Sequence, residues 1–460
     1  MTSAAVARHE IRQLFRLALP IFLAQLALTA LGVIDTIMSG WVGTDDLAAI
    51  GLGSNIMLPV FIFGTGILLA LTPLVSKQYA AKQLDKLPLY LNQGMWLALP
   101  LGVFSMVLLM NLQYLLVQLE LSPQVYQLTE DYLFYIAWGL PGVAFYQVLR
   151  FFWEGLGTTL PTMWISFVAL MVNVPLNALF IYGFEGWVEP LGAAGCGVAS
   201  ALVMWLMFVL GLLYVYRSPL SRPFVALSRL GWPQWHGGMA DILHIGFPNS
   251  LALLFEVSLF SFIALFIAQL GSVVIAGHQI AISFTSLAFM LPLSLAMAIT
   301  VRVSRGYGAQ DAAAVKLSLY VGLGIALSIG AGLSVFTFLL RDYIVALYSR
   351  DSEVLVLASA LLVFAAYYQV FDAVQVAAAG ALRGFHDTRV TMVVTFISYW
   401  MFGLAGGYAL AYTDWFTEAP MGVAGFWLGI VLGLSLAAIL LLWRLKQQYR
   451  VRMSESGGFQ

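Results

Sequence analysis

Three acidic residues lie inside long apolar stretches of this sequence. Asp35, Glu256 and Asp372 each belong to a run of mostly apolar residues long enough to cross a bilayer, which takes roughly 20 residues in a helix. An acid at the centre of such a helix costs on the order of 2.5–3.5 kcal/mol on insertion scales, and acids kept there commonly serve ion or proton pathways. The three acids are therefore the candidate sites for H+ or Na+.

Asp35 has candidate partners in another apolar stretch. Asn173 and Asn177 are four residues apart, so they share one face of a helix. Two amides and a carboxylate would form one buried polar cluster. Two other interpretations stay open: Asp35 could cap its helix or reach water, and the asparagines could simply join neighbouring helices.

Glu256 and Asp372 fall near the middle of their stretches. Tyr368, Gln369 and Gln375 lie within four residues of Asp372 and extend its polar helix face. Two neighbouring carboxylates repel each other unless a proton or cation lies between them. We expect a site for H+ or Na+ here, with Na+ held by Glu256, Asp372 and Tyr368. A buried pair that only joins two helices is the alternative, and the lack of Lys or Arg in the middle of the predicted stretches argues against it.

Two further positions are candidates for contact with a substrate. Phe260 follows Glu256 by four residues and shares its helix face, and Gln279 begins the next apolar stretch beside His278. A lone histidine near the start of a helix is more often structural than a proton carrier. The same alternative holds for Gln279.

The composition is that of a membrane protein. The chain has 460 residues, of which 61% are hydrophobic and 9% charged, whereas soluble proteins carry about 25% charged residues. Apolar windows predict an all-α integral membrane protein with twelve transmembrane helices in the lipid bilayer. The predicted spans lie near residues 14–39, 47–72, 90–114, 131–152, 161–183, 194–216, 242–269, 275–300, 316–339, 355–380, 390–412 and 421–443.

Positive charges alternate between the two sides of the predicted spans. All Lys and Arg residues except Arg341 and Arg350 fall at the termini or in every second connection. Since basic connections stay in the cytoplasm, both termini are predicted to be cytoplasmic. Two Arg–acid pairs lie at the cytoplasmic ends of spans four and ten. We expect both pairs to be solvated and either to belong to a gate or to fix the topology. They are Arg150 with Glu154 and Arg383 with Asp387.

The second half of the sequence repeats the first. Residues 71–82 match residues 299–310, and residues 155–163 match residues 384–392. Because both halves begin on the cytoplasmic side, the repeat is parallel, with its axis along the membrane normal. The predicted lobes of six helices each are residues 1–228 and 229–460.

Glycines four residues apart, and a further group of glycines in span nine, indicate where helices approach closely. We expect them to pack against neighbouring helices rather than to serve transport directly. They are Gly403, Gly407, Gly425, Gly429 and Gly433, and in span nine Gly322, Gly324, Gly330 and Gly332.

Other features exclude several functions. A net charge of −1 argues against nucleic-acid binding. The single cysteine, Cys196, excludes an intrachain disulfide. The sequence has no GxxxxGK[ST] motif, no HExxH and no Ser/His/Asp set, so we expect neither ATP hydrolysis nor another enzymatic activity, and no cofactor.

Several segments together resemble the multidrug and toxic compound extrusion (MATE) family, in its NorM-type branch. They are GVIDTIMSGWVGTDDLAAIGLGSNI, FEVSLF, GHQIA and the acid that precedes GALRG. The resemblance implies a V-shaped transporter of two six-helix lobes that exports cationic amphipathic compounds in exchange for Na+ or H+. It also implies an N-lobe site at Asp35, Asn173 and Asn177 and a C-lobe cation site at Glu256, Asp372 and Tyr368.

The expected protein is thus a secondary antiporter of small cationic drugs and dyes that works by alternating access. We expect a monomer in the plasma membrane, which would be the inner membrane of a Gram-negative bacterium. The alternative is a lipid-linked oligosaccharide flippase of the same superfamily. Such a flippase should have a basic cavity for pyrophosphate, and the predicted spans carry Lys or Arg only at their ends.

Overall fold

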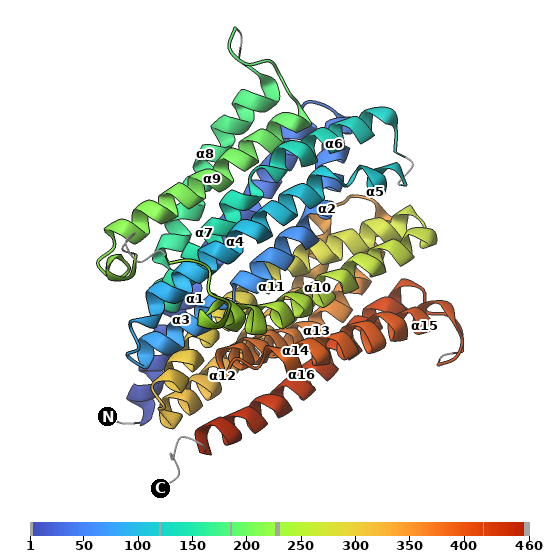
Figure 1. Cartoon of the computed structure of the whole chain (residues 1–460). Helices are drawn as coiled ribbons and strands as arrows, with labels where there is room; N and C mark the ends of the chain where they lie inside the picture. The colour runs from blue at the N-terminus through green and yellow to red at the C-terminus, as the bar shows by residue number, and fades with distance from the viewer. Residues whose placement is uncertain (1–2, 119–120, 185, 226–230, 417, 455–460) are drawn as a thin grey trace. The chain divides into compact units, whose positions relative to one another are not determined.

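The computed structural model describes residues 3–118, 121–184, 186–225, 231–416 and 418–454, and almost all of its regular structure is helical (Figure 1). The helices are α1 (Ser3–Gly40), α2 (Thr44–Leu68), α3 (Leu71–Ala80), α4 (Lys86–Met110), α5 (Gln113–Val117), α6 (Pro123–Ala137), α7 (Leu140–Gly155), α8 (Leu160–Tyr182), α9 (Ala193–Arg217), η1 (Arg222–Phe224), η3 (Trp235–Gly237), α10 (Met239–Ile267), η4 (Ala268–Leu270), α11 (Ser272–Gly308), α12 (Ala312–Ala346), α13 (Ser352–Gly384), α14 (Thr388–Thr395), η5 (Phe396–Ala405), α15 (Gly406–Tyr412) and α16 (Val423–Ser454).

The number of membrane spans agrees with the sequence. Within the described residues, 11 continuous helical segments are long and apolar enough to cross a membrane. The pair α6 and α7, bent by 44° at its junction, brings the number to 12 if it is one span. The predicted all-α, multi-pass membrane fold is therefore confirmed. Several helices run past their predicted ends, since α11 continues to Gly308 and α13 to Gly384.

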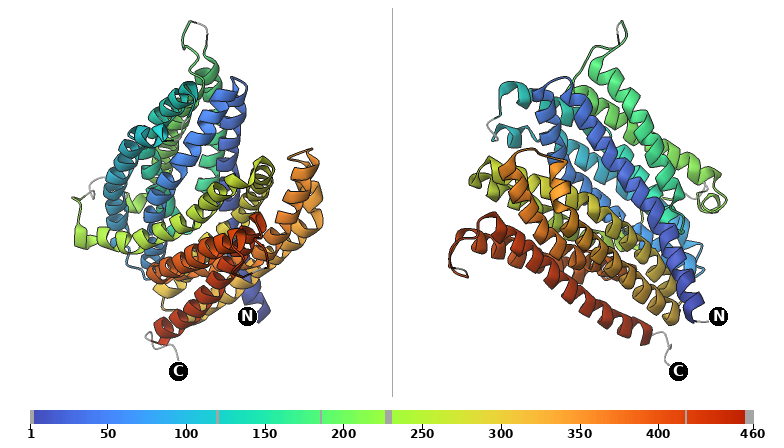
Figure 2. Two further views of the ribbon diagram at one scale, coloured as in Figure 1. Left: turned by 90° about the vertical axis from the view of Figure 1, so that its right-hand side faces the viewer. Right: turned by 180° about the vertical axis from the view of Figure 1, so that it is seen from behind.

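The chain forms two compact units. The N-terminal unit is Pro20–Ser250, and the C-terminal unit comprises Met1–Leu19 together with Leu251–Gln460. The unit boundaries fall inside the long helices α1 and α10. Helix α1 is the long dark blue helix in the right view of Figure 2. The predicted boundary between the lobes at residue 228 lies outside the described residues, so that division stays a prediction.

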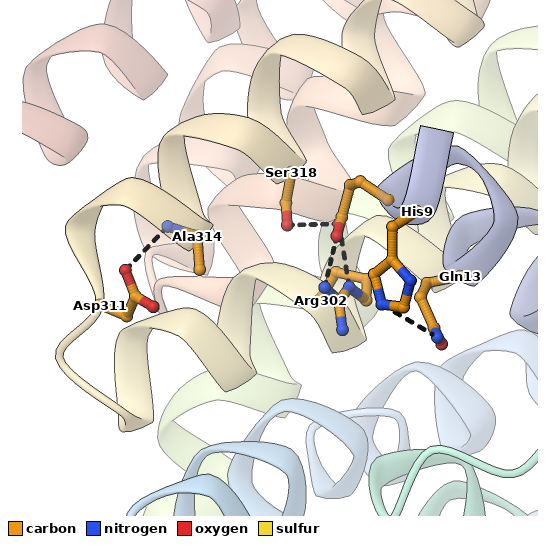
Figure 3. Close-up of polar contacts among 7 residues, drawn as sticks. His9, Gln13, Arg302, Asp311, Ala314 and Ser318 are labelled. Carbon is orange, nitrogen blue, oxygen red and sulfur yellow. Dashed lines mark hydrogen bonds and ion pairs between the residues drawn. The ribbon is translucent and has the colours of Figure 1, made fainter. Parts of the chain in front are cut away.

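The first turns of α1 are built into the C-terminal unit. Leu14 is fully buried in a core that α11, α12, α13 and α16 supply. The Glu10 carboxylate accepts hydrogen bonds from Arg302 of α11 and, at 2.6 Å, from the Ser318 hydroxyl of α12 (Figure 3). A buried acid is tolerated here because a guanidinium and a hydroxyl satisfy it.

The first turns of α10 are built into the N-terminal unit in a similar way. The Tyr90 hydroxyl donates to Asp241 at 2.9 Å. Just over two turns further on, the Asn249 amide donates to the backbone carbonyl of Gly66 at 2.8 Å. Each repeat therefore begins with a helix whose start is held by polar contacts.

Backbone contacts confirm the internal repeat. The Thr72 hydroxyl donates to the carbonyl of Phe151, and the matching Thr300 hydroxyl donates to the carbonyl of Gly380. Each bond joins the first matched segment (71–82 or 299–310) to the helix that leads into the second matched segment (155–163 or 384–392). The two halves therefore share one packing scheme. Left-handed backbone also recurs at matched positions, namely Lys82 and Gln310, Gly157 and His386, and Gly192 and Gly422.

The predicted glycine contacts hold in one region and fail in part of another. A Cβ on Gly429 would lie 2.4 Å from the carbonyl oxygen of Gly403 and 2.7 Å from the Cα of Gly407. Glycine is therefore required where α16 meets η5 and α15. Gly324 and Gly332 of α12 have no heavy atom within 4 Å of such a Cβ. The prediction of close packing was wrong for these two, because their side of α12 faces open space.

Candidate functional site

The structure brings Asp35 and the two predicted asparagines together in the N-terminal unit. Asp35 lies one turn before the end of α1, and α8 presents Asn173 and Asn177 on one face. The Asn177 amide nitrogen donates to Asp35 Oδ1 at 2.6 Å and to Asn173 Oδ1 at 3.0 Å. The Ser200 hydroxyl of α9 donates to Asp35 Oδ2 at 3.0 Å. Both carboxylate oxygens thus accept hydrogen bonds from neutral groups.

This cluster is buried, and two of its side-chain atoms lack a hydrogen-bond partner among the described residues. Asp35 is 8% exposed, and both asparagines are fully buried. Asn177 Oδ1 and Asn173 Nδ2 have no hydrogen-bond partner in the described part of the chain. A carboxylate with a spare amide oxygen beside it can accept a proton or a small cation, because oxygen ligands suit hard cations.

Sequence analysis missed two members of this cluster. Ser200 binds Asp35 directly, and the thiol of Cys196, one turn earlier on α9, lies within the same polar group. Their spacing of four residues puts both on the face of α9 toward Asp35. The sequence offers many serines in apolar spans, and nothing in the apolar pattern distinguishes this one.

The C-terminal unit holds the predicted pair of acids. Glu256 lies on α10 and Asp372 on α13, where Asp372 is 8% exposed and interacts electrostatically with Glu256. Tyr368, one turn before Asp372, interacts with that acid and lies beside Thr285 of α11. Three helices therefore contribute oxygen atoms to this region.

The two predicted glutamines are less closely tied to the acids. The Gln369 side-chain oxygen accepts a hydrogen bond from Thr337 of α12 at 2.9 Å. Gln375 is buried, and its oxygen has no hydrogen-bond partner among the residues described. Gln369 thus bonds toward α12, while Gln375 keeps a free acceptor. A supporting role for either residue at the acid pair stays a prediction.

A basic residue lies near the acid pair, contrary to expectation. Arg383 was placed in a cytoplasmic connection, but α13 continues to Gly384 and buries Arg383 to 6% exposure. Its guanidinium interacts electrostatically with Glu256. The long arginine side chain allows a group near a helix end to reach inward. Glu256 therefore interacts at longer range with a basic side chain, whereas Asp372 interacts with an acid and a tyrosine.

The expectation of solvated pairs was wrong for Arg150 and Glu154. Both are buried, with 2.8 Å between Arg150 Nε and Glu154 Oε1, and the Thr162 hydroxyl also donates to that oxygen at 3.0 Å. The corresponding predicted pair does not form in the same way, because Asp387 pairs with Arg444 of α16 at 2.7 Å. Periodicity alone did not show that α8 and α16 would cover these helix ends.

The remaining candidates lie near the same part of the C-terminal unit. Phe260 packs against its apolar core, and the Gln279 side chain is exposed on α11. His278 is buried and accepts a hydrogen bond from the Trp427 indole at 3.2 Å, a contact that suits a structural histidine. Contact of Phe260 or Gln279 with a substrate stays a prediction.

Comparison with known proteins gives consistent matches over the whole chain. The MatE family model matches residues 20–179 and 248–409. Multidrug resistance protein NorM of Photobacterium profundum is 43% identical over 440 residues, which cover 95% of this chain and 96% of that protein. Multidrug resistance protein MdtK of Yersinia pseudotuberculosis serotype O:1b is 43% identical over 438 residues, 95% of each chain.

Solved structures show the same fold. The eukaryotic MATE transporter AtDTX14 superposes with a TM-score of 0.86 at 22% identity, over 98% of this chain and 99% of that one. A MATE structure in the bent conformation gives 0.88 at 19% identity, over 99% of both chains. These relatives are named as transport or resistance proteins, in agreement with the prediction of a transporter rather than an enzyme. The chain belongs to the MatE family and has the fold of the solved MATE transporters.

Proposed function

We propose that this protein is a secondary multidrug antiporter that exports amphipathic cations, including drugs and dyes, in exchange for Na+ and H+. The observation that carries the proposal is a separate buried acid site in each unit. Asp35 accepts hydrogen bonds from Asn177 and Ser200, and Asp372 interacts with Glu256. The names of the NorM and MdtK relatives support the substrate class.

Exchange follows from competition for buried negative charge. Hydrogen bonds from neutral groups orient the Asp35 carboxylate but leave its charge in place, and a charge inside the membrane is costly. A proton, a Na+ ion or an organic cation each offsets that cost. Binding of one therefore favours release of another, which is the reciprocity that antiport requires. The two predicted lobes would expose the sites alternately to the two sides of the membrane.

The two sites differ in the ion that they suit. In the C-terminal unit, Glu256, Asp372 and Tyr368 can supply several oxygen ligands, which favours Na+. The charge of Arg383 also acts on Glu256, which supports one monovalent cation as the remaining compensation for the two acids. Asp35 has fewer oxygen ligands, which favours H+. We therefore assign Na+ to the C-terminal unit and H+ to Asp35.

The same proposal includes the setting of the protein. We place both termini in the cytoplasm, because nearly all Lys and Arg residues fall at the termini and in alternate connections. A monomer in the plasma membrane, or in the inner membrane of a Gram-negative bacterium, is sufficient for transport since each chain holds both sites. Cysteine labelling from either side of sealed vesicles tests the orientation.

The decisive experiment measures ethidium efflux from proteoliposomes of the purified protein. In one series the pH is fixed and the Na+ gradient varies; in the other, Na+ is absent and the pH gradient varies. We expect each gradient alone to drive efflux. Protein-free liposomes and the Asp35→Asn, Glu256→Gln, Asp372→Asn triple variant are the controls, since the triple variant keeps side-chain shape and loses all three charges.

Two results would count against the proposal. Without efflux under either gradient, the antiporter function itself is wrong. If efflux follows the pH gradient and ignores Na+, the acids of the C-terminal unit carry protons and the assignment of Na+ is wrong.

A further inference from the structure

One span of the C-terminal unit departs from regular α-helix. Its middle part, η5 (Phe396–Ala405), is a π-helix between α14 and α15. The matching helix of the first repeat, α8, is α-helical throughout. A π-helix has i→i+5 hydrogen bonds, and short π segments inside α-helices occur frequently at functional sites.

The repeat shows that η5 accommodates one extra residue. Asp387 corresponds to Thr158, because each amide bonds to the carbonyl five residues earlier. Tyr412 corresponds to Tyr182, because each hydroxyl donates to a carbonyl near the end of the first helix of its repeat, at 2.8 Å and 2.7 Å. The segment from Asp387 to Tyr412 is one residue longer than the segment from Thr158 to Tyr182. The extra residue rotates the later part of the span relative to a regular helix.

The π-helix buries a tyrosine hydroxyl beside the helix that carries Glu256. Tyr399 is fully buried, and its hydroxyl has no hydrogen-bond partner in the described ranges. The next residue, Trp400, donates to Ser258 of α10 at 3.1 Å, and its ring centroid lies 6.2 Å from that of Phe255. Since these two α10 residues flank Glu256, η5 packs on α10 at the level of that acid.

Tyr399 also belongs to the surroundings of the second acid. It interacts electrostatically with both Glu256 and Asp372, and it shares one core cluster with Tyr368 of α13. Leaving a hydroxyl unpaired in a protein interior costs roughly 1–3 kcal/mol. An unpaired hydroxyl that interacts with two acids and bonds to neither is available to a bound cation.

We propose that the Tyr399 hydroxyl is a further oxygen of the ion site in the C-terminal unit, and that the extra residue in η5 places it there. The inference rests on the proposed function of that site. A phenol hydroxyl donates a hydrogen bond to an ionised carboxylate and offers its oxygen to a bound cation. In the N-terminal unit, the neutral groups of Asn177 and Ser200 donate to Asp35 directly. Tyr399 is the comparable neutral group in the C-terminal unit.

The test compares Tyr399→Phe with the wild type and with Tyr408→Phe. The control Tyr408 lies on α15 of the same span and is 45% exposed. In proteoliposomes, we expect Tyr399→Phe to raise the Na+ concentration for half-maximal efflux by about threefold to tenfold, as for loss of one typical hydrogen bond. Efflux at saturating Na+ should persist, and Tyr408→Phe should match the wild type. Binding of radioactive Na+ to the purified proteins should shift by the same factor.

The outcomes separate this inference from the proposed function. If the wild type exports ethidium and Tyr399→Phe has an unchanged Na+ dependence, Tyr399 is not part of the site. Misfolding of Tyr399→Phe would also overturn the inference, because it would make the hydroxyl a requirement of the core. If the wild type fails to export at all, the antiporter proposal fails, while Na+ binding by the two proteins still decides the role of Tyr399.

Discussion

The polar cluster of the N-terminal unit, which we propose as an ion site, has no copy in the C-terminal unit. Tyr182 bonds to Met38 and its counterpart Tyr412 bonds to Phe266, so Met38 corresponds to Phe266. On this alignment, Asp35 corresponds to Ile263. Gly192 and Gly422 have left-handed backbone at matched positions, and on this alignment Ser200 corresponds to Ile430. Both isoleucines are fully buried. Where one unit has a carboxylate and its donor, the other has closed apolar packing.

The reverse holds for the acids of the C-terminal unit. Asp372 corresponds to the buried Val143, and Glu256 corresponds to Leu28. The two halves therefore share the helical framework, whereas the polar groups of the two proposed ion sites lie at different positions of the repeat. Two sites with different surroundings can respond to different ions, which identical copies could not.

The two units also compensate buried charge differently. Glu154 corresponds to Arg383 in the repeat. Glu154 is neutralised on its own helix by Arg150 at 2.8 Å, so that pair adds no net charge to the N-terminal unit. Arg383 instead interacts with Glu256 on another helix. Asp372 interacts with Glu256, which is itself an acid. The interactions described for Asp35 and Asp372 thus involve neutral groups and another acid, and no Lys or Arg among the described residues.

The strongest test of this contrast is to remove the acids of the C-terminal unit. We expect Glu256→Gln and Asp372→Asn to insert and fold but to lose Na+-driven efflux by at least about tenfold, the equivalent of 1.4 kcal/mol or more. Each variant keeps side-chain shape and loses charge. Purification yield, thermal unfolding and ethidium efflux are measured together. Wild-type efflux from either variant would remove that acid from the coupling site, and loss of yield instead of transport would make the pair structural.

A smaller and more selective effect is expected at Asp35. Asp35→Asn should reduce efflux driven by a pH gradient about tenfold and spare efflux driven by Na+, because only this acid is assigned to H+. Asn177→Ala removes a hydrogen bond and no charge, so a loss of about fivefold is expected. Efflux under each gradient is compared in the same liposome preparations.

Asp35→Leu is the matched variant that separates charge from packing. It removes the hydrogen-bonding capacity as well as the charge, whereas Asp35→Asn keeps the former. Should Asp35→Asn pump normally under a pH gradient while Asp35→Leu fails, Asp35 is a packing or capping residue and the proton site lies elsewhere.

The sequence was sufficient for features that depend on one helix at a time. Apolar length predicted the spans, and the i,i+4 spacing of Asn173 and Asn177 predicted that both would share a face. Their meeting with Asp35 was expected as one possible polar cluster, which the resemblance to the MATE family also implied. Ser200 and Tyr399 were not predictable in this way. Their place depends on how α9 and η5 pack, and in η5 on one extra residue that the repeat reveals only through matched contacts.

Charged residues near helix ends were the main source of error. The sequence pattern ends a span where a charge appears, so Arg150 and Arg383 were assigned to solvent. In the structure both are buried, because a neighbouring acid offsets each charge and the apolar stems of the arginines pack inside. Which acid lies near is set by contacts between helices, and hydropathy along one helix carries no information on that.

The framework that the two units share is expected to affect stability rather than transport. Gly155 and Gly384 are matched glycines, and a Cβ on them would lie 2.8 Å and 2.9 Å from the Cβ atoms of Val75 and Val303. The surroundings are nearly the same, so Gly155→Ala and Gly384→Ala should destabilise their units to a similar extent. Overpacking of this kind costs about 1–3 kcal/mol. Thermal unfolding of the purified variants measures the loss.

Two other helical glycines serve as matched controls for this comparison. Gly51 of α2 and Gly324 of α12 have no heavy atom within 4 Å of an added Cβ. Alanine there should be neutral or stabilising, since it favours helix by up to about 1 kcal/mol over glycine. If Gly155→Ala destabilises and Gly384→Ala does not, the shared packing has diverged in the C-terminal unit. The contrast between the units would then extend from the ion sites to the scaffold that carries them.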